Sequence, residues 1–408
     1  MSSLESPFIK STIKENNTII IFGDSITAFG VIRGLRKIQN LKIYIVSNNN
    51  KGIAASSKYV KEVLRLNSNN PKYVETFIEW VKDRFTNKPL VLIAGDDQAL
   101  IHLSKAYERL IDYVVLSFPR WEIVNKVINK ETTYLIAEEL DIPSIDTVRI
   151  SNFEELTDYL KKTNINFPVF LKSSDSAFMV KNFSTKGEIC FSVDQIVSAY
   201  NRYDGFNKSL LIQDFIPGDI DEIYAVLLVL NREGKVVKAT ANKKIRSGTM
   251  FGTTSLSSSI WNEELIRRSI TLAESIGYCG PMGVQFKFDP RNNEYKFLEV
   301  NGRFSVSVSL SQKCDANLPL IVFNEFMTQN RLERFRLEKT YKENILLWYP
   351  LNDLRLITQK RFFKNPFAYF YSLIGRGYIV EPFSFVDPKP LIKMISQGTQ
   401  NFFKRFKK

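Results

Sequence analysis

The sequence has very few of the residues on which many catalytic and metal sites depend. It contains one histidine, His102, and three cysteines, Cys190, Cys279 and Cys314, that lie far apart. A Ser-His-Asp triad and a histidine-based metal site are therefore nearly excluded, so any metal must be held by carboxylate and amide oxygens. The odd number of separated cysteines favours free thiols in a reducing compartment.

The sequence also lacks long apolar runs and a recognisable secretory signal. Its longest apolar runs, such as Tyr224–Leu230, are far too short to cross a bilayer. Residues 1–17 contain no apolar segment of the kind that signal peptides carry. A chain of 408 residues with 44% hydrophobic and 24% charged residues is instead typical of a globular protein of two or three domains. We therefore expect a cytoplasmic protein.

Acidic residues are scarce toward the C-terminus. The net charge is +13, and residues 331–408 hold 16 basic but only 6 acidic side chains. The first 330 residues are thus nearly neutral, which argues against a nucleic-acid groove through them. Segments that mix aromatic and basic residues, such as Asn401–Lys408, either lie on an anionic membrane surface or dock by their rings onto the protein. We expect most of the tail to dock, and leave open a peripheral contact with the inner membrane face for the last dozen residues.

The Gly-x-Gly-x-x-Gly fingerprint of dinucleotide-binding folds is absent, although Gly23 and Gly30 are present, and no acidic residue ends the second predicted strand. What the N-terminal region does contain is an alternation of buried strands and helices. This pattern predicts βαβ units and a parallel sheet. The predicted strands cover residues 18–24, 41–47, 89–95 and 113–117, and the helices between them include 25–37 and 98–109.

Two acidic residues, Asp96 and Asp97, follow the third predicted strand. They either meet a ligand, as residues at the carboxyl edge of open α/β sheets do, or cap the next helix. His102 lies in an apolar helical context, so we expect it to be structural. The charges of Lys61–Arg65 are expected on the solvated face of a helix.

The stretch 283–304 predicts a β-hairpin, because two runs of β-forming residues flank the turn-forming segment Asp289–Asn293. An alternating strand places residues 299, 301 and 303 on one face, and the paired strand can bring residue 285 beside them. Oxygen donors and a guanidinium on one face suit either hydrated Mg²⁺ with phosphates or an ordinary solvated strand. The residues concerned are Gln285, Glu299, Asn301 and Arg303.

Further polar residues after residue 120 form a set suited to a nucleotide. Lys130 precedes a predicted helix, and Lys172 ends a predicted strand. Two such lysines can neutralise phosphates, a strand end offers backbone groups to an adenine edge, and a carboxylate can hold ribose hydroxyls. The other members of the set are Gln213, Asp214, Phe215, Ile216, Asp221, Glu222, Lys244 and Arg246.

Four segments, in this order and rough spacing, resemble the ATP-grasp superfamily. They are Asn129–Pro143, Phe167–Lys172, Gln213–Gly218 and Gly283–Phe304, the last with Leu-Glu-Val-Asn-Gly-Arg at 298–303. The resemblance covers roughly residues 90–330. It looks most like the carboxylate–amine ligase branch, which includes D-aspartate ligases and ligases of surface-polymer gene clusters.

The resemblance implies a chain of the α/β plus α+β class, in which an N-terminal parallel-sheet domain precedes the two-lobed ATP-grasp fold. The implied divisions are a Rossmann-like domain at 1–120, a small lobe at 121–208 and a large lobe at 209–330. A basic, aromatic segment at 331–408 would then dock in part on the large lobe.

The resemblance also assigns residues to a nucleotide site. Lys130 and Lys172 would contact the ATP phosphates, and Lys244 would belong to the same site. Gln213 and the segment Asp214-Phe215-Ile216 would hold adenine. The ribose would be bound by Asp221 or Glu222, a choice that the spacing after Gly218 leaves open.

The remaining roles concern the metal and the reacting groups. By the same resemblance, Gln285, Glu299 and Asn301 would bind Mg²⁺, or Mn²⁺ in its place. Arg246 and Arg303 would face the γ-phosphate and the acyl phosphate.

The implied reaction phosphorylates a substrate carboxylate, after which an amine attacks the acyl phosphate and ADP and phosphate are released. Phosphorylation supplies the leaving group that a carboxylate lacks, while the protein positions the reactants and neutralises charge. The partners are therefore small-molecule carboxylates and amines. Two alternatives stay open: another acyl-phosphate enzyme of the carboxylase or carbamoyl-phosphate type, and a catalytically degenerate ATP-binding regulatory protein.

Three positions depart from the usual pattern of the superfamily. The loop Ser173–Ala177, which would cover the phosphates, contains no glycine, although glycine lets backbone N–H groups approach a phosphate closely. Gln285 stands where a metal-binding glutamate is common, and Gly302 replaces a frequent proline before Arg303. We therefore expect a loop that is stiffer or that closes differently, and weaker metal binding than in typical relatives.

Overall fold

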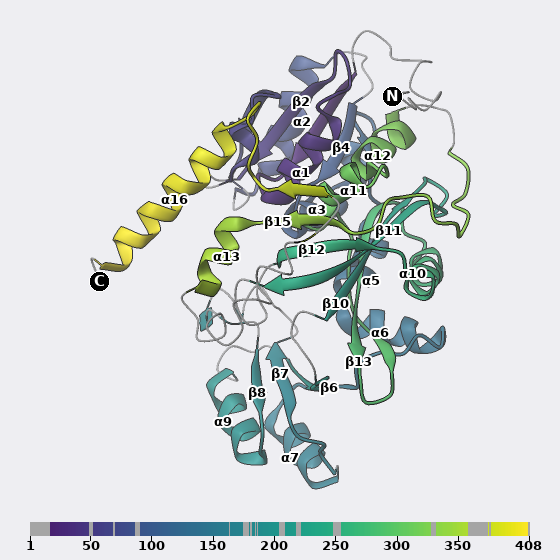
Figure 1. The fold of residues 1–408 in the computed structure, drawn as a ribbon, viewed down its shortest axis with the longest axis vertical. Helices are drawn as coiled ribbons and strands as arrows, with labels where there is room; N and C mark the ends of the chain where they lie inside the picture. Colours follow the sequence, from purple (N-terminus) through teal and green to yellow (C-terminus); the bar gives the residue numbers. More distant parts are fainter. Residues whose placement is uncertain are drawn as a thin grey trace.

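The structure is a computed structural model built around three sheets (Figure 1). It describes residues 17–48, 52–67, 70–85, 90–162, 164–173, 179, 182–183, 185, 187–203, 209–217, 222–247, 254–327, 332–357, 374 and 377–406. In this part of the chain, no helix has both the length and the hydropathy needed to cross a membrane.

The N-terminal sheet is parallel throughout and has five strands in the order β3-β2-β1-β4-β5, which confirms the predicted parallel sheet. Alternate residues of its central strand enter different cores: Ile20 and Phe22 join one apolar cluster, while Ile19 and Ile21 join another. Burial on both faces explains the continuous apolar run. The elements of this region are β1 (Thr18–Phe22), α1 (Ile26–Leu35), β2 (Lys42–Ser47), η2 (Ala54–Ser56), β3 (Val60–Arg65), α2 (Tyr73–Arg84), β4 (Leu90–Ala94), α3 (Asp97–Lys105), α4 (Tyr107–Leu110) and β5 (Val115–Leu116).

One prediction in this region is wrong. The charges of Lys61–Arg65 were expected on a helix, but they lie on β3 at the edge of the sheet. Only Lys61 and Arg65 are exposed, and the residues between them are half-buried. An edge strand tolerates such charges because one side of it remains open to solvent.

A second sheet has four antiparallel strands in the order β6-β9-β7-β8. β9 lies between β6 and β7, although the predicted division at residue 208 assigned this strand to the large lobe. Sequence order alone does not show which sheet a strand joins. The elements are β6 (Thr147–Ile150), α7 (Phe153–Lys162), β7 (Val169–Ser173), β8 (Glu188–Cys190), α9 (Val193–Tyr203) and β9 (Leu210–Asp214).

The third sheet has seven strands in the order β14-β13-β10-β11-β12-β15-β16, antiparallel except for the last pair. The predicted hairpin is confirmed as β13 and β14. Two strands of the C-terminal segment, β15 and β16, extend this sheet. The elements are β10 (Ile223–Leu230), β11 (Val236–Ser247), β12 (Thr254–Ile260), α10 (Glu263–Ile276), β13 (Gly280–Asp289), β14 (Glu294–Asn301), α11 (Val308–Lys313), α12 (Leu318–Met327), β15 (Ile345–Trp348), α13 (Pro350–Ile357), β16 (Gly377–Val380) and α16 (Lys389–Phe406).

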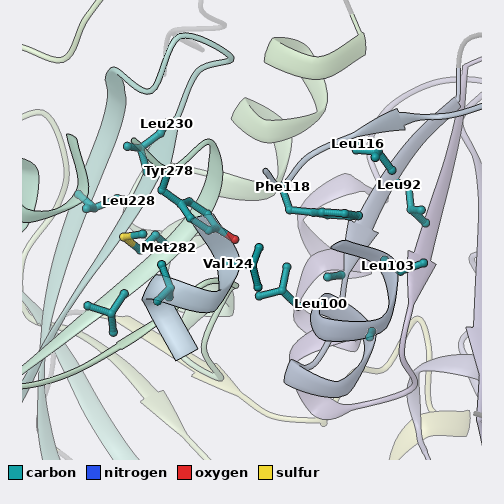
Figure 2. Close-up of a cluster of buried hydrophobic side chains, with 14 of the residues drawn as sticks. Leu92, Leu100, Leu103, Leu116, Phe118, Val124, Leu228, Leu230, Tyr278 and Met282 are labelled. Atoms are coloured by element: carbon teal, nitrogen blue, oxygen red, sulfur yellow. The ribbon is translucent and has the colours of Figure 1, made fainter. Parts of the chain in front are cut away.

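The first and third sheets share a continuous apolar core (Figure 2). Leu92 and Leu100 from the N-terminal region meet Leu228 and Met282 of the large sheet in one cluster, with Phe118 in the same group. The helices α5 (Trp121–Ile128) and α6 (Lys130–Glu139) also pack here. The second sheet has a separate cluster drawn from residues 150–212. The hairpin therefore packs on the larger core, and the second sheet has a smaller core of its own.

Candidate active site

The hairpin gathers the three predicted metal ligands. Gln285 lies opposite Glu299, and Gly283 lies opposite Asn301. Gln285 Nε2 donates to Glu299 Oε1 at 2.9 Å, and Asn301 Nδ2 approaches the same oxygen at 3.4 Å. All three side chains are half-buried, so they form one polar cluster at the open end of the hairpin.

This cluster offers one carboxylate and two amide oxygens to a cation. Among the described residues, no three His, Cys, Asp or Glu side chains come together as a metal site. Both amide nitrogens now point at Glu299, and a rotation of each amide by half a turn would present its oxygen instead. The donor set therefore fits Mg²⁺ that takes its remaining oxygens from phosphate and water.

Lys130 reaches this cluster from the first residue of α6. Asn129 caps the helix by accepting a hydrogen bond from Thr132 N at 3.3 Å, which fixes where the helix begins. Lys130 Nζ lies 3.9 Å from Glu299 Oε2. A lysine predicted to bind phosphate and a carboxylate predicted to bind metal are therefore neighbours, although 168 positions separate them in the chain.

Tyr134 holds α6 against the hairpin. Its hydroxyl donates to Leu298 O at 2.8 Å and accepts from Gln213 Nε2 at 3.0 Å. Burial raises the pKa of Tyr134 to about 12, so the phenol stays protonated and can donate. The sequence alone did not single out Tyr134, because its partners, Leu298 and Gln213, lie far from it along the chain.

The Gln213 side chain, predicted near adenine, lies inside the small lobe. It is 4% exposed, and its Nε2 also donates to Thr147 Oγ1 at 2.7 Å. This amide therefore connects β9, β6 and α6. An adenine edge beside this strand would meet backbone groups of the segment that follows.

The segment Asp214-Phe215-Ile216 runs from the small lobe toward the large one and is held by two residues of the hairpin. Lys287 Nζ donates to Ile216 O at 2.9 Å and lies 5.5 Å from the centre of the Phe215 ring. Arg291 forms ion pairs with both Asp214 and Asp289. The sequence could have indicated Lys287, since it follows Gln285 by two residues on the same strand.

Two further predicted nucleotide contacts lie on strands. Lys172 is half-buried on β7 opposite Leu211, and Lys244 is buried on β11 opposite Ser257. Glu222 forms an ion pair with Lys243 at 3.7 Å. Asp221 and residues 174–177 of the predicted phosphate loop lie outside the described residues.

Arg246, predicted to face phosphate, is buried against the C-terminal segment. Its Nη2 lies 2.5 Å from Asp353 Oδ2, and Trp348 Nε1 donates to the same oxygen at 2.6 Å. The sequence did not indicate this pair, because Asp353 belongs to α13 in the tail. The tail thus orients a residue that the resemblance placed at the reaction centre.

Arg303, the other predicted catalytic residue, contacts the N-terminal region. Its Nε and Nη2 donate to Asp97 at 2.7 and 2.6 Å. Asp96 accepts from Ala99 N at 2.8 Å and so caps α3, as one of the two interpretations held. Burial raises the pKa of the Asp96 carboxyl, and this hydrogen bond opposes the rise.

Residues 207–344 match the model of a family described as ATP-grasp in the biosynthetic pathway with Ter operon. A D-aspartate ligase of Enterococcus faecium (strain Aus0004) is 24% identical over 316 residues, which cover 72% of this chain and 73% of that protein.

Two solved structures show the same fold. One is the biotin carboxylase domain of Hydrogenobacter thermophilus 2-oxoglutarate carboxylase in complex with MgADP, with a TM-score of 0.63, 15% identity, and coverage of 82% of this chain and 74% of that one. The other is an L-amino acid ligase from Bacillus licheniformis, with a TM-score of 0.60, 14% identity, and coverage of 82% and 79%. The likenesses to solved structures show that the chain has the ATP-grasp fold, and the sequence matches show that it resembles the carboxylate–amine ligases that share this fold.

Proposed function

We propose that the chain is an ATP- and Mg²⁺-dependent ligase that joins a carboxylate to an amine through an acyl phosphate, with release of ADP. The observation that carries the proposal is the 3.9 Å approach of Lys130 Nζ to Glu299 Oε2, within the cluster that also holds Gln285 and Asn301. A cation site beside a phosphate-binding lysine suits phosphoryl transfer, in which charge neutralisation supplies most of the catalysis.

Different residues of the chain would bind the different parts of the nucleotide and its metal. Lys130, Lys172 and Lys244 would neutralise phosphate oxygens, while the hairpin oxygens would hold the metal. Backbone groups at Asp214, Phe215 and Ile216 would meet adenine, and Glu222 or Asp221 would meet the ribose. Arg246 and Arg303 would stabilise charge on the transferring phosphoryl group and on the acyl phosphate.

The similarity to a D-aspartate ligase and to an L-amino acid ligase supports amide-bond formation. The complex of a structural neighbour with MgADP supports the choice of nucleotide and metal. Both partners of the reaction would then be small molecules, one with a free carboxylate and one with a free amine.

The test measures ADP release with pooled carboxylates and amines, in the presence of ATP and Mg²⁺. We expect turnover only when both substrate classes are present, with a condensed product by mass spectrometry. Glu299→Gln should reduce kcat about 10²- to 10³-fold, because it removes the only carboxylate of the hairpin cluster. Glu294→Gln, on the same strand, is the matched control and should leave the rate unchanged.

A degenerate regulatory protein is the second candidate, and one observation favours it. Both predicted catalytic arginines are already held by carboxylates, Arg246 by Asp353 and Arg303 by Asp97. ATP binding without turnover for any pair of substrates, and with equal ADP release by the wild type and Glu299→Gln, would support this candidate against the ligase.

A further inference from the structure

The C-terminal helix α16 leaves two apolar side chains on the side that faces away from the protein. Ile392 is 62% exposed and Ile395 is 47% exposed, whereas Met394 packs against the cluster of the first sheet. Lys393 lies on the protein side, close enough to lower the pKa of Asp24 against the larger effect of burial. Pro390 is buried and Leu391 is half-buried, so apolar residues lie on both sides of α16, whereas a surface helix normally directs them only to the core.

Hydrogen bonds attach the start of this helix to the N-terminal region, and they fix the direction in which the helix leaves the protein. Asp387, two residues before α16, accepts hydrogen bonds from Ser57 Oγ at 2.5 Å and from Lys58 N at 3.0 Å. From this attachment the helix runs outward from the body to the C-terminus (Figure 1, yellow).

Exposed apolar side chains also precede the helix. Before the helix, Phe385 and Val386 are exposed, and the Phe385 ring packs on that of Phe383 with centroids 4.7 Å apart.

The charge around this apolar surface has one sign. From residue 377 onward the sequence has only two acidic residues, Glu381 and Asp387, and both are buried. Glu381 is paired with Arg33, and Asp387 holds η2. The basic residues of the same stretch are Lys389, Lys393, Lys404, Arg405, Lys407 and Lys408.

We propose that α16, together with Phe383–Val386, is an interfacial anchor that lies on an anionic lipid bilayer. Apolar side chains on the outward side would enter the boundary between headgroups and acyl chains, and the flanking lysines and arginines would meet lipid phosphates. The helix lies on the bilayer rather than crossing it, because no described helix is long and apolar enough to span one. This inference is independent of the proposed ligase reaction.

Charge decides between a bilayer and a second copy of the chain. Pairing two α16 helices by their apolar sides would bring together two stretches that carry six basic residues each and no exposed acidic residue. Like charges oppose such a pairing, whereas an anionic surface is attracted to both stretches.

The test is co-sedimentation of the full chain with vesicles of phosphatidylcholine alone or mixed with phosphatidylglycerol. We expect pelleting only with the mixed vesicles, and less of it as salt rises. The variant Ile392→Glu/Ile395→Glu should bind about tenfold or more weakly, since two apolar side chains are lost from the buried side. Both side chains are exposed, so the fold should be retained.

The matched control is Leu135→Glu/Phe191→Glu, which makes the same change in net charge at two exposed apolar residues outside the anchor. It should pellet like the wild type. Equal loss of binding in both double variants would show that net charge alone acts, and would overturn the proposal. The proposal would also be overturned if the wild type forms a dimer and does not bind vesicles, and if Ile392→Glu/Ile395→Glu converts that dimer to a monomer.

Discussion

Asp97 is a positioning residue for Arg303, because it accepts hydrogen bonds from two of the guanidinium nitrogens. Asp97→Asn keeps the shape but removes the charge, so Arg303 should lose its fixed orientation. We expect kcat to fall about 10- to 100-fold with a smaller change in the KM for ATP. Steady-state kinetics of the ligase reaction measure both values. Asp112→Asn, at an exposed residue nearby in sequence, is the control, and equal kinetics for both variants would refute this role.

Asp96 should make stability depend on pH. Burial raises its pKa, so the folded chain binds this proton more tightly than the unfolded chain, and ionisation costs stability as pH rises through the raised value. Asparagine is also a good helix cap and does not ionise. Asp96→Asn should therefore gain stability relative to the wild type as pH rises above about 4, the ordinary pKa of an aspartate. Urea unfolding at several pH values measures the difference, and a difference that does not change with pH would contradict the prediction.

At the scale of elements, α13 stabilises β11 through a buried ion pair. Arg246 and Asp353 are both nearly inaccessible, so Asp353→Asn leaves a buried guanidinium without its counter-charge. Loss of one partner should cost about 3–5 kcal/mol of unfolding free energy. The double variant Asp353→Asn/Arg246→Met should recover most of it, because no unpaired charge remains. Chemical denaturation of the three chains tests this, and equal stability of the single and double variants would rule it out.

The hairpin was predictable from sequence, whereas the partners of the two predicted catalytic arginines were not. Alternation of β-forming residues and a turn-forming segment gave its strands, and period two placed residues 299, 301 and 303 on one face. The partners of Arg303 and Arg246 lie 206 and 107 positions away along the chain. No local pattern links residues at such distances, so these contacts appear only when the sheets are assembled.

At the scale of the whole molecule, the shared core predicts that the first and third sheets unfold together. Phe118 is 1% exposed between them (Figure 2). Phe118→Ala should lower the unfolding free energy by about 3–5 kcal/mol while the transition of these two sheets remains single. Phe153→Ala, at an exposed residue of the small lobe, should cost less than about 0.5 kcal/mol. Tryptophan fluorescence and circular dichroism can monitor the unfolding. Separate unfolding transitions for the two sheets would disprove the common core.

The global arrangement was predictable only in outline. Continuous apolar runs indicated a parallel sheet, and this sheet is present. The pairing of β9 with β6 and β7, and the extension of the large sheet by β15, depend on contacts between distant strands. The exposure of Ile392 and Ile395 on α16 was also not predictable, because the sequence does not show which side of a helix faces the protein.

The separate core of the four-stranded sheet has a consequence for how the molecule opens. Three polar contacts connect this sheet and the segment after it to the hairpin and α6: Gln213 with Tyr134, Ile216 with Lys287, and Asp214 with Arg291. An outward movement of the small lobe would break only a few such polar contacts, which water can replace. Such a movement would leave the shared core and the core of the four-stranded sheet intact. A ligand that binds between the lobes would then hold them together. It should slow the hydrogen exchange of backbone amides near these polar contacts, while the exchange of amides in the apolar cores stays the same.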